Sequence, residues 1–155
     1  GVAQHDIGLL RLKTPLTFNK NIQPVALPEA EKLHTGNVVL TGWGSVSTGL
    51  RPKLPVELQK AELPIVDYES CFESLHAVSK DAELFDTQVC TGPIGGDISA
   101  CSGDSGGPIV QKNADGKPEI VGIVSWGMYP CGVAGTPSVF TRVSAYTEWI
   151  KAKTN

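Results

Sequence analysis

The stretch Cys101-Ser102-Gly103-Asp104-Ser105-Gly106-Gly107-Pro108 is the most informative part of this chain. A nucleophilic serine needs a tight backbone around it, so that its own N–H and a neighbouring N–H converge on a developing oxyanion. Gly103 would allow that close approach because it has no Cβ. Asp104 is placed to hold the loop through a buried ion pair. The competing interpretation is a glycine-rich hairpin with an ordinary exposed serine, and the ordered run after Cys101 favours the catalytic one.

Short apolar runs with turn residues between them lie on both sides of this stretch. The chain has 155 residues, of which 17 are glycine and 11 are proline. Strand-like runs bounded by such residues predict an all-β fold, as an antiparallel barrel or sandwich. The predicted strands include residues 7–12, 38–40, 63–66, 120–125 and 139–143.

Two short helices interrupt the predicted strands. Asp67 is placed to cap a helix over residues 68–76, because an aspartate at this position accepts hydrogen bonds from the first N–H groups. Ser144 is expected to cap a second helix that runs to the end of the chain. Several prolines mark the stretch after the first strand as an extended connector.

Composition and charge exclude several functional classes. Hydrophobic residues make up 41% of the chain and charged residues 19%, with a net charge of −3. This balance argues against a nucleic acid as the main partner. The longest apolar stretch, around residues 120–126, is too short to span a membrane. The chain begins Gly1-Val2-Ala3 without a methionine or signal sequence, and we expect it to be the interior part of a longer protein.

The four cysteines, Cys71, Cys90, Cys101 and Cys131, are widely spaced and contain no CxxC pair, which argues against a zinc site. Four cysteines allow three disulfide pairings. Disulfides would indicate secretion or a similar oxidising compartment. Four free thiols in a cytosolic core are the alternative.

Five ordered motifs together resemble the chymotrypsin/trypsin family of secreted serine proteases. They are the serine segment 103–108, the segment 6–12, Thr41-Gly42-Trp43-Gly44, the segment 123–127, and the segment 137–143 with the ending Trp149-Ile150. The resemblance implies an antiparallel Greek-key β-barrel, the second of two, preceded by the last strand of the first barrel. It assigns residues 1–13 to the end of the first barrel, 14–28 to the connector, 29–143 to the second barrel and 144–155 to a short C-terminal α-helix.

The resemblance also implies roles for individual residues. Ser105 would be the nucleophile and Asp6 the carboxylate that orients a catalytic histidine, as in the general serine-protease triad. The backbone N–H groups of Gly103 and Ser105 would form the oxyanion hole. Asp104 would pair with the new N-terminal ammonium that is formed when a zymogen is cut. The substrate backbone would pair with the strand at Ser125, Trp126 and Gly127, and the disulfides would be Cys71–Cys90 and Cys101–Cys131.

The catalytic histidine has no evident candidate among the three histidines of the chain. His5 adjoins Asp6, and neighbouring side chains on an extended strand point to opposite faces. His34 is expected to be a solvated loop residue, and His76 lies at the end of the first predicted helix. The resemblance therefore implies that the base lies on an N-terminal fragment of the same protease, and that the isolated chain is inactive.

The first specificity pocket would be formed by Ser99, Gly127 and Ser138. A neutral Ser99 at its floor would leave a buried substrate cation unpaired, which is costly. Asp97 is interpreted as a loop residue outside the pocket. These features favour chymotrypsin-like cleavage after Leu, Phe, Tyr or Met, with an elastase-like preference second.

The expected partners are therefore the N-terminal fragment, protein or peptide substrates and proteinaceous inhibitors. No cofactor or metal is expected. A catalytically inactive homologue that acts as a binding or regulatory module is the alternative function.

Overall fold

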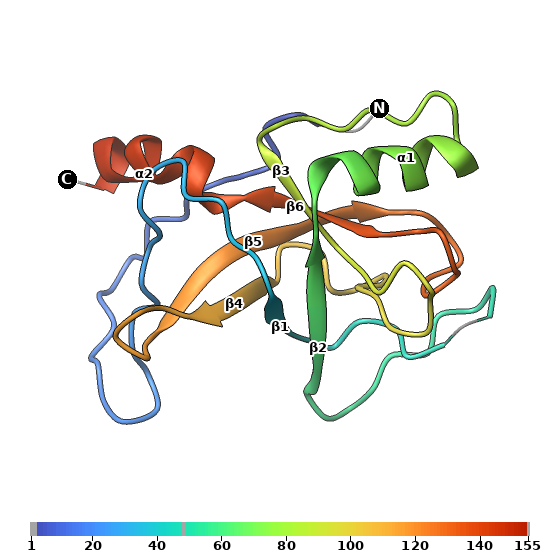
Figure 1. The fold of residues 1–155 in the computed structure, drawn as a ribbon. Helices are drawn as coiled ribbons and strands as arrows, with labels where there is room; N and C mark the ends of the chain where they lie inside the picture. The colour runs from blue at the N-terminus through green and yellow to red at the C-terminus, as the bar shows by residue number, and fades with distance from the viewer. Residues whose placement is uncertain (1–2, 48, 155) are drawn as a thin grey trace.

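A computed structural model describes residues 3–47 and 49–154. The strands form one closed antiparallel barrel in the order β1-β2-β3-β6-β5-β4 (Figure 1). The fold is therefore the predicted antiparallel β-barrel with a short C-terminal helix. Its elements are β1 (Asn37–Gly42), β2 (Gln59–Val66), α1 (Tyr68–Val78), β3 (Gln88–Thr91), β4 (Pro108–Lys112), β5 (Pro118–Gly127), β6 (Ser138–Arg142), the 3-10 helix η1 (Val143–Tyr146) and α2 (Thr147–Thr154).

The barrel is held together by apolar side chains that point inward from alternate strand positions. Burying each of the larger ones stabilises the fold by roughly 1.5–3 kcal/mol relative to leaving it exposed. The central cluster consists of Val38, Leu40, Leu63, Ile109, Val121, Val124 and Phe140.

Helix α1 packs against β3 at one side of the barrel. Asp67 caps it as predicted, and its Oδ1 accepts a hydrogen bond of 2.9 Å from the N–H of Ser70. That bond stabilises the carboxylate and lowers the pKa of Asp67. A disulfide joins Cys71 of α1 to Cys90 of β3. The apolar side of the helix thus forms a second core, against which Trp126 and Met128 pack.

The prediction that Ser144 caps the C-terminal helix is wrong. Ser144 is buried within η1, where its hydroxyl accepts a hydrogen bond from Arg142 Nη1 (2.9 Å) and donates one to the carbonyl of Lys32 (2.7 Å). Helix α2 begins only at Thr147, whose hydroxyl donates to the carbonyl of Pro28. These serine and threonine hydroxyls attach the C-terminal helices to the connector.

The strand predicted over residues 7–12 is also not formed. This segment has no regular secondary structure, and none of the described strands pairs with it. Leu10 is 95% exposed and Leu12 57%. A strand without a neighbouring strand leaves its backbone groups unpaired, so apolar composition alone does not make one here. The boundaries predicted for residues 1–13, 14–28, 29–143 and 144–155 stay predictions.

His34 is buried, which contradicts its interpretation as a solvated loop residue. Its Nε2 lies 2.8 Å from Oε1 of Glu119 on β5, and Lys32 Nζ donates to the same oxygen at 2.6 Å. Burial alone would raise the pKa of Glu119, but the hydrogen bonds from Lys32 and His34 outweigh it and lower that pKa. This cluster fixes the segment that precedes β1 to strand β5.

No helix among the described residues combines the length and the apolar character that crossing a bilayer would require.

Candidate active site

Ser105 lies exposed in a tight turn that leads into β4. Gly103 (φ +103°) and Gly106 (φ +78°) both occupy the left-handed region, which glycine adopts without strain. A Cβ on Gly103 would lie 3.2 Å from the Cα of Gly44, so this position is also crowded. The Gly106 N–H donates to the carbonyl of Val124 (3.0 Å) and the Val124 N–H to the carbonyl of Gly107 (2.9 Å). The turn is thereby fixed against β5.

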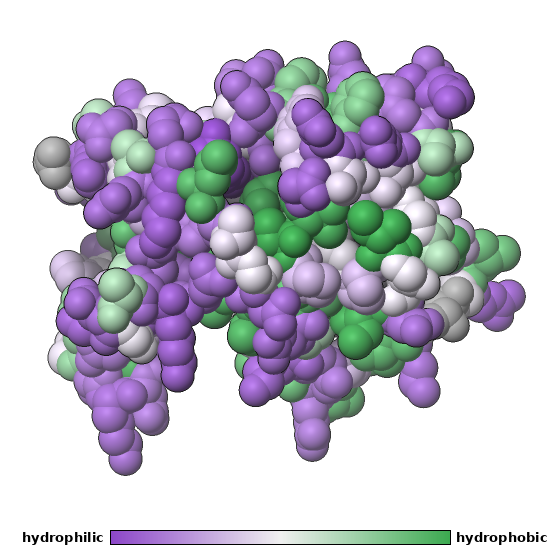
Figure 2. Space-filling view, in the orientation of Figure 1, coloured by the Kyte–Doolittle hydropathy of each residue, from purple (hydrophilic) through white to green (hydrophobic). Residues whose placement is uncertain are grey.

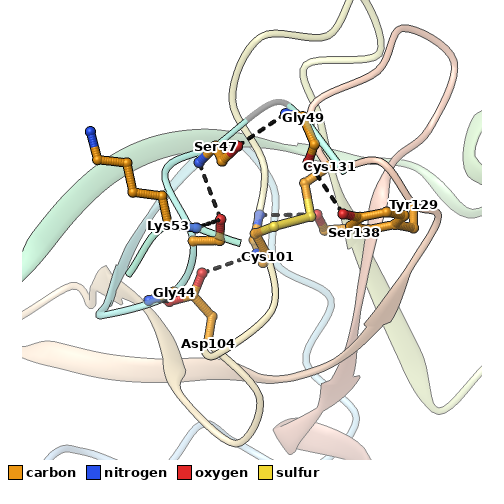
Figure 3. The surroundings of a disulfide bond; sticks show 11 residues. Gly44, Ser47, Gly49, Lys53, Cys101, Asp104, Tyr129, Cys131 and Ser138 are labelled. Atoms are coloured by element: carbon orange, nitrogen blue, oxygen red, sulfur yellow. Dashed lines mark hydrogen bonds between the residues drawn. A yellow bond between two sulfur atoms is a disulfide. The ribbon is translucent and has the colours of Figure 1, made fainter. Parts of the chain in front are cut away.

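Asp104 directs its carboxylate inward, beneath the turn. Oδ1 accepts a hydrogen bond from the N–H of Gly44 (2.9 Å) and Oδ2 one from the N–H of Cys101 (3.0 Å), as Figure 3 shows. The Gly-Trp-Gly turn leaves room for this group, because a Cβ on Gly44 would lie 2.1 Å from Oδ2. Among the described residues, no basic side chain forms a salt bridge with Asp104. The expected ion pair stays a prediction.

Asp6 is attached to the barrel by hydrogen bonds from Ser125 and Thr141. The Ser125 hydroxyl donates to Oδ2 of Asp6 (2.7 Å), and the Thr141 hydroxyl donates to the Asp6 carbonyl (2.7 Å). The register of β5 and β6 shifts between Val124 and Trp126, so Ser125 lies at a β-bulge. Bulges of this kind redirect a side chain, and here the hydroxyl turns toward the N-terminal segment.

Ser105 and Ser125 line the same cavity, which has a volume of about 180 Å³. Its apolar walls include Val124, Trp126 and Met128. The full lining is Ala100, Cys101, Ser102, Ser105, Val124, Ser125, Trp126, Gly127, Met128, Tyr129 and Cys131. We call it the serine cavity.

The three residues expected in the specificity pocket have different surroundings, and their assignment to one pocket stays a prediction. Gly127 lines the serine cavity, whereas Ser99 lines a larger cavity of about 560 Å³ together with Asp97 and Asp104. Ser138 is buried, and its hydroxyl accepts a hydrogen bond from the N–H of Ala100 (3.2 Å). The disulfide between Cys101 and Cys131 borders both cavities.

Each of the three histidines has a partner away from Ser105. His5 Nδ1 lies 2.8 Å from the hydroxyl of Tyr146, while its neighbour Asp6 bonds to Ser125. His34 pairs with Glu119. His76 stacks on Phe72, with ring centroids 3.9 Å apart. In the described part of the chain, therefore, no imidazole lies between Asp6 and Ser105.

Sequence reasoning did not find the hydrogen bond from Ser125 to Asp6. It assigned Ser125 only to the substrate-binding strand, on its backbone. The side-chain contact joins residues 119 positions apart, and no local pattern indicates it.

A methyl group at Gly44 should disrupt this site. We expect Gly44→Ala to displace the Asp104 carboxylate and to leave buried N–H groups unsatisfied, at a cost of about 1–3 kcal/mol in the free energy of unfolding. Gly95→Ala is the matched control, because a Cβ there meets nothing within 4 Å; its effect should stay within about 0.5 kcal/mol. Urea unfolding of the two variants measures the difference. Equal stabilities would contradict the role of Gly44 in leaving room for the Asp104 carboxylate.

The comparisons with known proteins agree with this geometry. The family model for trypsin matches residues 1–150. The chain is 43% identical to trypsin-1 of Astacus astacus over 96% of its own length and 59% of that protein. It is 38% identical to serine proteinase stubble of Drosophila melanogaster over 95% of the chain and 18% of that protein.

A third relative is the clotting factor G beta subunit of Tachypleus tridentatus, to which the chain is 37% identical over 95% of its length and 49% of that protein. The chain thus spans between about a fifth and three-fifths of the length of these relatives. The match covers the serine turn, the Asp6 segment and every strand of the barrel. The chain therefore belongs to the chymotrypsin/trypsin family of serine proteases.

Proposed function

We propose that this chain is the C-terminal part of a serine endopeptidase that cleaves peptide bonds through an acyl-enzyme. The observation that carries the proposal is the placement of Asp6. Its carboxylate is held by Ser125, which lines the same cavity as the exposed Ser105. With the nucleophile on this cavity and the carboxylate bonded to a serine of its wall, an imidazole from another segment could join the two.

In the proposed reaction, Ser105 Oγ attacks the carbonyl carbon of the substrate and its proton passes to that imidazole. The imidazole then protonates the leaving amine, and water hydrolyses the acyl-serine by the reverse sequence. The N–H groups of Gly103 and Ser105 would stabilise the oxyanion. Within the described residues, neither N–H donates a hydrogen bond to the protein. Losing one such donor typically costs about 3–4 kcal/mol of transition-state stabilisation.

The imidazole would come from an N-terminal piece of the same protease, which is the partner we propose. Leu10 and Leu12, next to Asp6, expose most of their apolar surface. Figure 2 shows further apolar side chains gathered across the middle of one face of the molecule. Without the base, a comparable triad loses roughly six orders of magnitude in turnover, so the isolated chain should be inactive.

The larger cavity would receive the new N-terminus that cleavage of a zymogen creates. Asp104 lines this cavity and is buried, with 9% of the residue exposed. A buried carboxylate favours a cationic partner, because an uncompensated charge in a low-dielectric site is costly. The two disulfides support secretion as the location of the protein.

Large apolar side chains are the substrate residues that the serine cavity suits best. Val124, Trp126 and Met128 form apolar walls, and Gly127 leaves the wall open. Among the described residues, no acidic side chain lines this cavity, so an arginine or lysine there would have no countercharge. We propose cleavage after Leu, Phe, Tyr or Met, with smaller side chains as the alternative.

The catalytic role of Ser105 is tested by covalent labelling of the whole protease. We expect an organophosphate to add one phosphoryl group to the peptide that contains Ser105, as detected by mass spectrometry. The Ser105→Ala variant should not react, and the isolated chain should react several orders of magnitude more slowly. If the folded, processed protease fails to react, the chain is an inactive homologue instead.

Substrate preference is tested with matched peptides that differ only in the residue before the scissile bond. We expect kcat/KM to be at least about tenfold higher for Phe or Leu than for Arg, because a buried cation would be unpaired. Faster cleavage after Arg would contradict this preference and would indicate that Asp97, which lines the larger cavity, supplies a countercharge.

A further inference from the structure

The loop that follows β1 lies beside the serine turn and is stabilised by hydrogen bonds to the hydroxyls of two of its own serines. We call residues 45–47 and 49–54 the Ser45 loop. The hydroxyl of Ser45 accepts hydrogen bonds from the N–H groups of Ser47 (3.1 Å) and Lys53 (3.0 Å). The hydroxyl of Ser47 accepts one from the N–H of Gly49 (3.1 Å). These bonds fix the position of Gly49 relative to Ser45.

The Ser45 loop meets the serine cavity at two separate points. At one, the Ser45 N–H donates to the carbonyl of Ser102 (2.9 Å), the residue after Cys101. At the other, the hydroxyl of Tyr129 donates to the carbonyl of Gly49 (3.2 Å), as Figure 3 shows beside the disulfide. Tyr129 lines the serine cavity and is two residues before Cys131.

These contacts form a closed ring. It runs from Cys101 through Ser102 to the Ser45 loop, from Gly49 to Tyr129, and from Cys131 back to Cys101 through the disulfide. The two cysteines of this ring line both the serine cavity and the larger cavity that contains Asp104. Tyr129 is 51% exposed, so its hydroxyl closes this ring at the surface of the molecule.

We propose that Tyr129 is a positioning residue for substrate binding, an inference that rests on the proposed endopeptidase function. Its hydroxyl holds the wall formed by Met128 and Tyr129 at a fixed separation from the Ser45 loop. Without that bond, the wall and the loop move independently, and the substrate must order them when it binds. The effect therefore falls on KM, whereas the chemistry at Ser105 is unchanged.

The test compares Tyr129→Phe with Tyr68→Phe. Both variants lose a tyrosine hydroxyl that donates to a backbone carbonyl. Tyr68, the first residue of α1, donates to the carbonyl of Leu84 (2.8 Å) and has no bond to the Ser45 loop. In the whole protease, we expect Tyr129→Phe to raise KM for the preferred peptide about three- to tenfold, in line with the loss of one hydrogen bond. The value of kcat and the rate of organophosphate labelling should stay within about twofold, and Tyr68→Phe should leave all three unchanged.

A second measurement does not depend on activity. In the Ser105→Ala background, added trypsin should cut after the exposed Lys53. We expect a faster cut in Tyr129→Phe, because the loop is released at Gly49, and an unchanged rate in Tyr68→Phe. The proposal is overturned if the cut is not accelerated, if KM is unchanged, or if both tyrosine variants behave alike. A wild-type protease that resists labelling would instead refute the proposed function, and the trypsin cut would still report on the ring.

Discussion

The buried carboxylate of Asp104 holds together the parts on which the site depends. It accepts one hydrogen bond from the N–H of Gly44, two residues after β1, and one from the N–H of Cys101, before the serine turn. Leaving either N–H unsatisfied would cost about 1–3 kcal/mol, so the two segments are constrained to meet at this group. Ser105, the next residue, is therefore placed by a charge that lies beneath it.

The barrel positions the rest of the site relative to this centre. The backbone of β5 at Val124 forms hydrogen bonds with the serine turn. The next residue, Ser125, donates its hydroxyl to Asp6. The bulge at this point makes both contacts possible from adjacent residues. Behind them, α1 and the Cys71–Cys90 disulfide support Trp126, so that the walls of the serine cavity rest on a second apolar core.

Local signals in the sequence were sufficient for the features that depend on neighbouring residues. The Asp67 cap and the alternation of strands and turns both follow from short-range chemistry. The resemblance implied the two disulfides that the structure contains.

The errors concern residues whose partners are distant in sequence. His34 was expected in solvent because it lies in the polar stretch 32–36, yet it is buried against Glu119, 85 positions away. Ser144 was expected as a helix cap, yet its hydroxyl bonds to a carbonyl 112 positions away. The 7–12 strand failed for the converse reason, since its apolar pattern has no strand among the described residues to pair with.

We propose that Asp6 and Ser105 are two members of a catalytic triad and that an N-terminal piece of the same protease supplies the third. A crystal structure of the whole processed protease tests it most directly. The account predicts an imidazole from the N-terminal piece, with Nδ1 within hydrogen-bonding distance of the Asp6 carboxylate and Nε2 facing Ser105 Oγ. A structure in which that position is filled by a side chain that cannot take a proton, or by His5 of this chain, would contradict the account.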